Sequence, residues 1–383
     1  MILRYNASYD GKDTRRKSFL DIREKLQEIG RGFRIEGEFA GYEHIKMGNV
    51  NQTYQVTYRR DDGALKNYIV QWVNTYAFKE PEKLMHNADL ITEYIRARKQ
   101  GQIALHYHHT QDRKIYIYDD DGFWRLCNFI PSCTYNSSED MEVLRRTGEA
   151  FGEFQILLSD FPVEDLYETI PDFHNTPKRL AKLFADAEAD VVGRVAEVRT
   201  ELDYIASVRE EAEKLTRLYE AGKLPLRVTH NDTKINNVLF DVESQQPVAI
   251  IDLDTVMPGL VGHDFGDGVR FAANFVEEDC REYEKAGCDL ERFRAFAEGF
   301  LSQTADILTE EERKTLSLSV LSLAVELGSR FLDDYITGDQ YFTIRYPDHN
   351  LVRARCQLSL ARDIQKKLPQ MDAIVESCWA AQK

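Results

Sequence analysis

Hydrophobic and polar residues alternate along much of the first third of the chain, as they do in half-buried β-strands. Alternation over residues 54–58 and 68–73 surrounds a polar stretch with Asp62-Gly63 at its centre, which predicts a hairpin. The alternating pattern begins near Phe39 and is interrupted at Gly41 and again at Gly48-Asn49. The beginning of the chain therefore predicts an antiparallel, strand-rich region.

Two helices and two further strands are also expected in this first region. Apolar residues at helical spacing predict helices over residues 14–29, ending at Gly30, and over residues 82–99. Strands are expected at 114–118 and 123–130, joined by a turn rich in aspartate and ending in glycine.

Beyond Pro131 the pattern becomes mainly helical. Helices are expected over 141–158, over 177–221 in one or two pieces, and from about residue 290 to the end; short strands are expected at 226–229, 237–241 and 248–253. We therefore expect an α+β, bilobal, protein-kinase-like fold, with a nucleotide-binding lobe at residues 1–130. A helical lobe at 131–383 would carry the catalytic loop and the acceptor site. A length of 383 residues suits two cores better than one.

Composition and charge argue against a nucleic-acid or membrane partner. The net charge of −16 argues against a nucleic-acid partner, because polyanions bind basic surfaces. No signal-peptide pattern opens the chain and no run of about 18 apolar residues occurs, so no membrane partner is expected. The six cysteines contain no C-x-x-C pair. A cytoplasmic location fits these features, and the oligomeric state stays open.

The chemistry lies in an H-x-D-x-x-x-x-N motif formed by His230, Asp232 and Asn237, followed by Asp252 at the end of an apolar strand. Kinase catalytic loops have this layout: the first Asp orients or deprotonates an acceptor hydroxyl, and the Asn and later Asp hold magnesium. We interpret Asp232 as the catalytic residue, and Asn237 and Asp252 as ligands of Mg²⁺ beside ATP. A simple turn at 230–232 is the alternative interpretation.

Two nearby aspartates are interpreted differently. Asp254 would either support the metal site or begin the turn before Met257. Asp264 begins an Asp-Phe-Gly triplet, which in protein kinases holds the metal, but it lies too far beyond the catalytic loop. A buried Asp264 bonded to backbone amides of a loop is the expected arrangement.

The signal for the nucleotide phosphates is weaker. The turn at Gly48 contains one glycine, yet its backbone amides and the side chains of Asn51 and Thr53 could surround phosphates. An ordinary hairpin turn is the alternative. Gln71 occupies the strand position where many kinases have a phosphate-pairing lysine. Neutralisation of ATP would then depend on the metal, with Gln71 donating a hydrogen bond.

On these residues the chain resembles the aminoglycoside phosphotransferase and choline kinase superfamily, and within it the N-acetylhexosamine 1-kinases. The resemblance covers nearly the whole chain and rests on Gln71 and on the stretches RVTHNDTKINN, AIIDLDTVMPG, DFGDGVRF and YFTIRYPDHNLVR. It implies ATP, Mg²⁺ and transfer of phosphate to the anomeric hydroxyl of N-acetylglucosamine or N-acetylgalactosamine. The turn at Gly48, the Cys127-Asn128 region and the N-terminal extension depart from that pattern.

The resemblance also implies the positions of both ligands. The adenine would lie near Asn128 and Ile130, and Phe271, Arg330 and Tyr341 would contact a small-molecule sugar together with Asp232. An aromatic face with a few directed hydrogen bonds suits a sugar. The alternative makes Phe271 and Tyr341 core residues and Arg330 a surface cation.

Other functions remain possible from the sequence. A kinase for another sugar, choline or homoserine would have the same catalytic loop, although a quaternary ammonium would need an aromatic and acidic cage. A non-catalytic nucleotide or sugar sensor is the rival from a different class. The presence of Asp232, Asn237 and Asp252 argues against a sensor.

Overall fold

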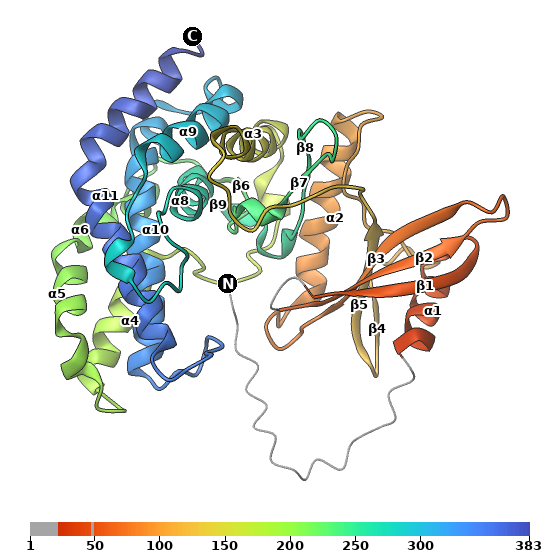
Figure 1. Ribbon diagram of the computed structural model, residues 1–383, viewed down its shortest axis with the longest axis horizontal. Coiled ribbons are helices and arrows are strands. Elements are labelled where there is room, and N and C mark those ends of the chain that lie inside the picture. The colour runs from red at the N-terminus through yellow and green to blue at the C-terminus, as the bar shows by residue number, and fades with distance from the viewer. Residues whose placement is uncertain (1–21, 47–49) are drawn as a thin grey trace. The chain divides into compact units, whose positions relative to one another are not determined.

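The computed structural model describes residues 22–46 and 50–383, and the chain divides into two compact units, Met1–Pro131 and Ser132–Lys383. The expected boundary at 130/131 lies one residue away. Figure 1 shows the first unit as a sheet with helices and the second as mainly helical. The predicted α+β class, with a strand-rich first part and a helical second part, is confirmed.

The N-terminal unit contains one antiparallel five-stranded sheet. Its strands lie in the order β1 (Glu38–Ile45), β2 (Gln52–Arg59), β3 (Leu65–Val73), β5 (Gly122–Asn128) and β4 (Ile117–Asp119). The predicted hairpin joins β2 to β3, and Gly63 adopts φ +83° in its turn. Two helices accompany the sheet, α1 (Ile22–Gly32) and α2 (Pro81–Arg98).

Helix α1 packs against one face of this sheet. Leu26 and Ile29 are fully buried in a cluster with apolar residues of β2, β3 and β5. Gly30, expected to stop the helix, lies inside it instead. A Cβ at Gly30 would lie 1.8 Å from the hydroxyl of Tyr58, so this glycine allows the helix to approach the sheet. The prediction failed because glycine serves close packing here. Residues 14–21 of the predicted helix lie outside the described part.

The C-terminal unit is built from helices and two short antiparallel strand pairs. The helices are α3 (Met141–Leu157), α4 (Thr176–Ala189), α5 (Arg199–Ser207), α6 (Arg209–Ala212), α7 (Lys214–Glu220), α8 (Val261–Ala272), α9 (Leu290–Thr304), α10 (Glu310–Ile336) and α11 (His349–Ala380). Strand β6 (Arg227–Thr229) pairs with β9 (Met257–Gly259), and β7 (Val238–Phe240) pairs with β8 (Pro247–Ile250). The single or double helix expected over 177–221 is thus divided into four.

Helix α8 was missed because its glycines resemble turn signals. Gly266 would bring a Cβ within 2.6 Å of the backbone oxygen of Ser319 on α10, and Gly268 within 2.5 Å of the Phe296 ring on α9. These glycines let α8 pack closely on its neighbours. The helix carries residues that bond to the loop at residues 230–233, so its placement matters for the candidate site.

Helix α10 crosses the C-terminal unit and is held at its N-terminus. Thr309 and Glu312 form a capping box. The buried Glu312 also forms an ion pair with the half-buried Arg227 of β6, at 2.6 Å between Nε and Oε1. Among the described residues, α10 alone is long and apolar enough to cross a membrane, but 83% of its apolar window is buried inside the protein. That burial is typical of a core helix.

Helices α3 and α9 approach each other at glycines. A Cβ at Gly299 would lie 1.8 Å from the carbonyl oxygen of Arg145, and one at Gly148 would lie 2.1 Å from that of Phe296. Helix–helix contact at this separation leaves no room for a methyl group. The pair therefore depends on these glycines.

We predict that Gly299→Ala lowers the free energy of unfolding by about 1–3 kcal/mol through overpacking. The gain in helix propensity from alanine, roughly 0.5–1 kcal/mol, is smaller than this cost. Urea denaturation followed by circular dichroism measures the difference. Glu298→Ala, at the exposed neighbouring position of α9, is the control and should change stability by about 0.5 kcal/mol at most. Equal stability of the two variants would contradict the close approach.

Candidate active site

The loop after β6 turns sharply before it presents Asp232. Asn231 adopts the left-handed conformation with φ +62°, which asparagine tolerates better than most residues. Its side chain donates to the carbonyl oxygens of Thr229 and Thr255. The following turn ends in a short 3₁₀ helix, Ile235–Asn237, before β7 begins. The loop conformation is therefore specified locally.

Asp264 of α8 anchors this loop from beneath. The side chain is fully buried, and its Oδ1 accepts from the Asn231 amide at 2.8 Å. Oδ2 accepts from the His230 amide at 3.0 Å and from Nε2 of Gln155 at 2.7 Å. Burial raises the pKa of Asp264, while these donors oppose the increase. The expected bonding of a buried Asp264 to loop amides is observed.

A second carboxylate of α8, that of Asp267, also bonds to this loop. Oδ2 of Asp267 accepts from the backbone amide of Thr233 at 3.0 Å. The other oxygen of Asp267 pairs with the buried guanidinium of Arg270 at 2.7 Å, and Arg270 also pairs with Glu278. Burial lowers the pKa of Arg270, but the two carboxylates outweigh it and raise the pKa. This network fixes the loop at Thr233.

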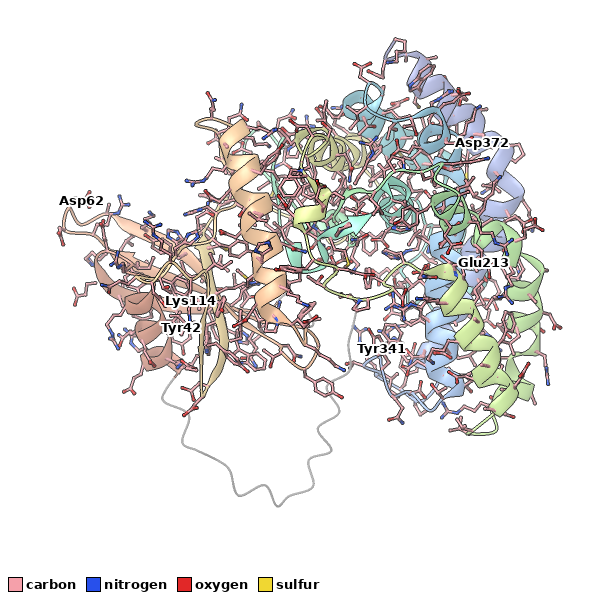
Figure 2. All side chains as sticks on the ribbon, turned by 180° about the vertical axis from the view of Figure 1, so that it is seen from behind. Tyr42, Asp62, Lys114, Glu213, Tyr341 and Asp372 are labelled. Atoms are coloured by element: carbon pink, nitrogen blue, oxygen red, sulfur yellow. The ribbon has the colours of Figure 1, made fainter. Side chains whose placement is uncertain are left out.

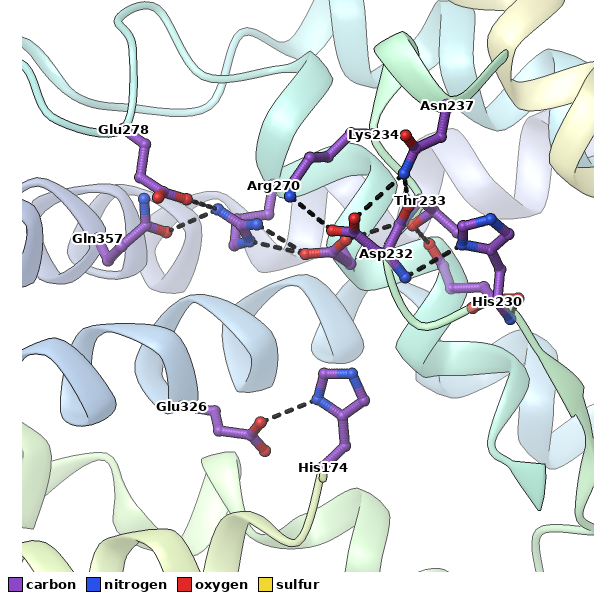
Figure 3. A network of polar contacts seen from close by, with 12 residues as sticks. His174, His230, Asp232, Thr233, Lys234, Asn237, Arg270, Glu278, Glu326 and Gln357 are labelled. Carbon is purple, nitrogen blue, oxygen red and sulfur yellow. Dashed lines mark hydrogen bonds and ion pairs between the residues drawn. The ribbon is translucent and has the colours of Figure 1, made fainter. Parts of the chain in front are cut away.

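Asp232 lies between a cation and an amide. Its Oδ1 is 2.6 Å from Nζ of Lys234, and its Oδ2 accepts from Nδ2 of Asn237 at 3.1 Å (Figure 3). Burial raises the pKa of Asp232, but the charge and hydrogen bond of Lys234 together with the nearby His230 oppose this, and the net effect holds the pKa of the carboxyl below its ordinary range. Burial lowers the pKa of Lys234, and the nearby Asp232 and Asp267 more than compensate. Asp232 is thus an oriented carboxylate at neutral pH.

His230 joins its loop by hydrogen bonds to the segment that precedes Asp252. Its Nδ1 accepts from the Asp232 amide at 3.3 Å, so the ring proton lies on Nε2, which donates to the carbonyl oxygen of Ile251 at 2.9 Å. The Ile251 amide in turn donates to the Asn237 carbonyl oxygen at 2.9 Å. Hydrogen bonds through His230 and Ile251 therefore join the loop of Asp232 and Asn237 to the residue before Asp252.

The donor set of Asn237 and Asp252 suits magnesium. Nδ2 of Asn237 is bonded to Asp232, which identifies the other side-chain atom as the oxygen. Asp252 is exposed and left-handed, with φ +62°, two residues after the end of β8. Amide and carboxylate oxygens are the ligands that Mg²⁺ prefers. Asp254, by contrast, is buried in the turn after Asp252.

The residues predicted to bind nucleotide phosphates lie in the N-terminal unit. Gly48 falls outside the described residues. Oδ1 of Asn51 accepts from the Asn74 amide at 3.0 Å, which joins Asn51 to the residue after β3. Thr53 accepts from Nε2 of Gln71 at 3.0 Å, so these two predicted residues are in contact.

The residues predicted to hold adenine lie at the end of β5. The Asn128 amide donates to the His106 carbonyl oxygen at 3.1 Å, and its side chain bonds to the Ala104–His106 segment. The amide and side chain of Asn128 thus have structural partners, and an adenine contact would use other backbone groups. Ile130 is buried. Its contact with adenine stays a prediction.

The residues predicted to bind the acceptor occupy two places in the C-terminal unit. Phe271 is half-buried on α8, four residues after Asp267 and therefore on the same helix face. Arg330 of α10 lies over the Phe342 ring at 5.7 Å, and the Tyr341 ring meets that of Phe342 at 4.8 Å. Tyr341 is exposed in the segment after α10 (Figure 2).

Sequence analysis overlooked a polar cluster beside Arg330. Buried Glu326 accepts from Thr176 at 2.7 Å and pairs with Nδ1 of His174 at 2.9 Å (Figure 3). Burial raises the pKa of Glu326, but the nearby His174 and Arg330 hold it at about 2. Nε2 of His174 has no hydrogen-bond partner among the described residues. Sequence separation hid this cluster, because its members lie about 150 residues apart.

Arg179 adds a second guanidinium to this cluster. Its Nη2 donates to the carbonyl oxygen of Phe173 at 3.4 Å, and Arg330 lies 5.5 Å from the ring of the same Phe173. Burial lowers the pKa of Arg179, and the charge of Arg330 lowers it further. Two cations therefore converge on one aromatic residue.

Comparison with protein families identifies the chain. Residues 42–297, more than half of its length, match the model of the phosphotransferase enzyme family. The chain belongs to this family. Lys234, which sequence analysis did not single out although it lies inside the motif, falls within the matched residues.

Solved structures share the phosphotransferase fold at low sequence identity. A microcompartment-associated aminopropanol kinase is 14% identical, with a TM-score of 0.62 over 92% of this chain and 98% of that one. A choline kinase from Cryptosporidium parvum is 13% identical, with a TM-score of 0.54 over 94% and 98%. A spectinomycin phosphotransferase in complex with ADP is 13% identical, with a TM-score of 0.53 over 92% and 98%. At these identities the likeness establishes the fold.

We predict that Asp264→Asn loosens the loop that carries Asp232. The asparagine side chain has one accepting oxygen, and its NH₂ group can only donate. At least one of the three N–H groups that Asp264 binds would therefore be buried without a partner, at a cost of about 1–3 kcal/mol. Hydrogen exchange over residues 226–240 should become faster, and the urea midpoint should fall. Asp372→Asn, on the exposed face of α11 (Figure 2), removes the same charge and should change neither. Unchanged exchange in Asp264→Asn would contradict the anchoring role.

We also predict acid sensitivity from His263 of α8. Burial and the neighbouring His174 lower the pKa of His263 to about 3, whereas Glu326 opposes this effect. Because the unfolded chain binds the proton near pH 6.5, stability is lost as pH falls from 6.5 towards 3. Between pH 7 and 5 the wild type should lose about 2 kcal/mol more than His263→Asn in urea denaturation. Parallel pH profiles would contradict this assignment.

Proposed function

We propose that this phosphotransferase uses ATP and Mg²⁺ to phosphorylate the anomeric hydroxyl of an N-acetylhexosamine, giving the sugar 1-phosphate. The observation that carries the kinase chemistry is the held carboxylate of Asp232, between Lys234 and Asn237. Such a carboxylate can orient an acceptor hydroxyl and receive its proton as the phosphorus–oxygen bond forms.

The neighbouring groups have distinct roles in this proposal. Asn237 fixes the rotamer of Asp232, and Lys234 balances its charge and can attract the transferred phosphoryl group. Asn237 and Asp252 would hold Mg²⁺, which would neutralise phosphate charge when bound. ADP in the similar spectinomycin phosphotransferase supports a nucleotide as the phosphate donor.

The cluster around Phe173 supports a neutral, oxygen-rich acceptor. Arg179 and Arg330 contact this residue, and Tyr341 and Phe342 lie beside Arg330. Two guanidinium groups would repel the ammonium of an amino alcohol, but they can donate to hydroxyl and acetamido oxygens. This charge arrangement favours a sugar over choline or ethanolamine.

A kinase of amino alcohols or aminoglycosides is the second candidate. The similar solved structures include an aminopropanol kinase and a choline kinase, which favours that class. In such an enzyme an acidic residue would have to face the ammonium group. Glu326 is the nearby candidate, although it is already paired with His174 and Thr176.

We predict ATP-dependent turnover on N-acetylglucosamine or N-acetylgalactosamine, but not on choline, ethanolamine or homoserine. ADP release measures turnover, and phosphorus NMR identifies the 1-phosphate. The methyl glycosides, which lack the anomeric hydroxyl, should be inert. Asp232→Asn should reduce turnover about 100- to 10,000-fold because it removes the proton acceptor.

Controls separate the chemistry from the acceptor assignment. Glu243 is exposed and follows the same loop in the sequence. Glu243→Gln, which removes its charge, should retain wild-type turnover. Turnover on amino alcohols alone would replace the sugar by the second candidate. ATP binding without turnover on any acceptor would favour a sensor, and phosphorylation of the methyl glycosides would exclude the anomeric position.

A further inference from the structure

One buried carboxylate on α10 receives two hydrogen bonds from the segment that leads into α4. Oε2 of Glu326 accepts from Oγ1 of Thr176 at 2.7 Å. Its Oε1 accepts from Nδ1 of His174 at 2.9 Å (Figure 3). Glu326 is almost fully buried, and an ionised carboxylate can only accept, so the imidazole carries its proton on Nδ1. Because both donors belong to one short segment, a single carboxylate fixes that segment against α10.

The segment itself is a tight turn, residues 172–178, that is shaped by its own hydrogen bonds. Asp172 adopts the left-handed conformation with φ +55°, and its Oδ1 accepts from Nδ2 of Asn175 at 3.1 Å. Asn175 caps α4 by accepting from the amide of Lys178 at 3.2 Å, and Nζ of Lys178 pairs with Asp172 at 2.8 Å. These bonds give the turn its shape, and Glu326 determines where the turn lies on α10.

The turn carries Phe173, on which two guanidinium groups converge. The rings of Phe173 and His174 lie 4.5 Å apart between centroids. Arg330, one helical turn after Glu326 on α10, lies 5.5 Å from the Phe173 ring. Arg179 of α4 donates to the carbonyl oxygen of Phe173 at 3.4 Å. Both guanidinium groups therefore reach Phe173 from the two helices that Glu326 joins.

The ring of His174 also contacts α8. Its centroid lies 4.7 Å from that of His263. Asp267 follows four residues later on the same helix face, and it accepts from the amide of Thr233, the residue after Asp232. The turn at His174 and the loop of Asp232 thus contact one face of the same helix.

We propose that Glu326 and His174 are positioning residues for the acceptor, because their hydrogen bond holds Phe173 against Arg179 and Arg330. Neither residue needs to touch the acceptor, which agrees with their burial. An apolar pair of similar volume would fill the same space without the cost of a buried charge, but it would not fix the direction of the turn. This inference rests on the proposed function, which places the acceptor at this cluster.

The test separates acceptor binding from nucleotide binding. His174→Phe keeps a ring but removes the donor to Glu326. ADP release gives kcat and the KM values for ATP and for the N-acetylhexosamine that the wild type phosphorylates. We expect the acceptor KM to rise about tenfold or more, with kcat and the KM for ATP within about threefold of the wild type. The residues predicted to bind the nucleotide phosphates and adenine lie in the N-terminal unit, away from this turn.

A conservative variant checks that the hydrogen bond is responsible. His174→Asn keeps an N–H donor at the position of Nδ1, so its acceptor KM should lie within about threefold of the wild type. A purely structural role of the ring would not be restored by asparagine, which is much smaller.

A second pair of variants keeps the test valid if His174→Phe does not fold. Thr176→Val removes only the hydroxyl that Glu326 accepts from, and should raise the acceptor KM about threefold or more, whereas Thr176→Ser should not. Thr200→Val makes the same change at an exposed position of α5 and should behave as the wild type does.

Three outcomes would overturn the inference alone. One is an unchanged acceptor KM in folded His174→Phe or Thr176→Val, with only a lower urea midpoint, which would make the pair structural. The second is an equal rise of the KM values for acceptor and ATP. The third is a failure of His174→Asn to restore the acceptor KM. A wild-type chain without turnover on any N-acetylhexosamine would instead remove the proposed function, and this inference with it.

Discussion

The loop that carries Asp232 depends on one buried carboxylate, that of Asp264. A carboxylate without water is stable only if hydrogen-bond donors replace the solvent. Here the donors are the amides of His230 and Asn231 and the side chain of Gln155, which come from the loop and from α3. Because each donor is needed to compensate the charge, the loop, α3 and α8 adopt their positions together.

Close packing transmits this constraint to the rest of the C-terminal unit. Helix α8 lies against α10 at Gly266, where a side chain would collide with the backbone at Ser319. At its N-terminus α10 pairs with β6 through Glu312 and Arg227, and β6 leads directly into the catalytic loop. The loop is therefore anchored from α8 and, through the strand before it, from α10. A shift of α10 would disturb both attachments of Asp232.

Local signals in the sequence were sufficient for part of this arrangement. The spacing of His230, Asp232 and Asn237 predicted a loop that the hydrogen bonds do bring together, and the hairpin at Gly63 followed from turn chemistry. Gly30 and α8 were misinterpreted because a glycine needed for a turn and one needed for close packing look identical in a sequence. Only the neighbour across the interface distinguishes them.

Contacts between charged residues that lie far apart in the sequence cannot be predicted from a motif. Gln71 occupies a position where many kinases have a lysine, and the pairing of β3 with β5 places Arg125 directly opposite it. Strand pairing joins residues 54 positions apart, and no local pattern records it. The same holds for His174 and Glu326, whose contact spans 152 positions. Chemistry carried by consecutive residues can be predicted from a motif, whereas the charges that select a ligand depend on which elements the fold brings together.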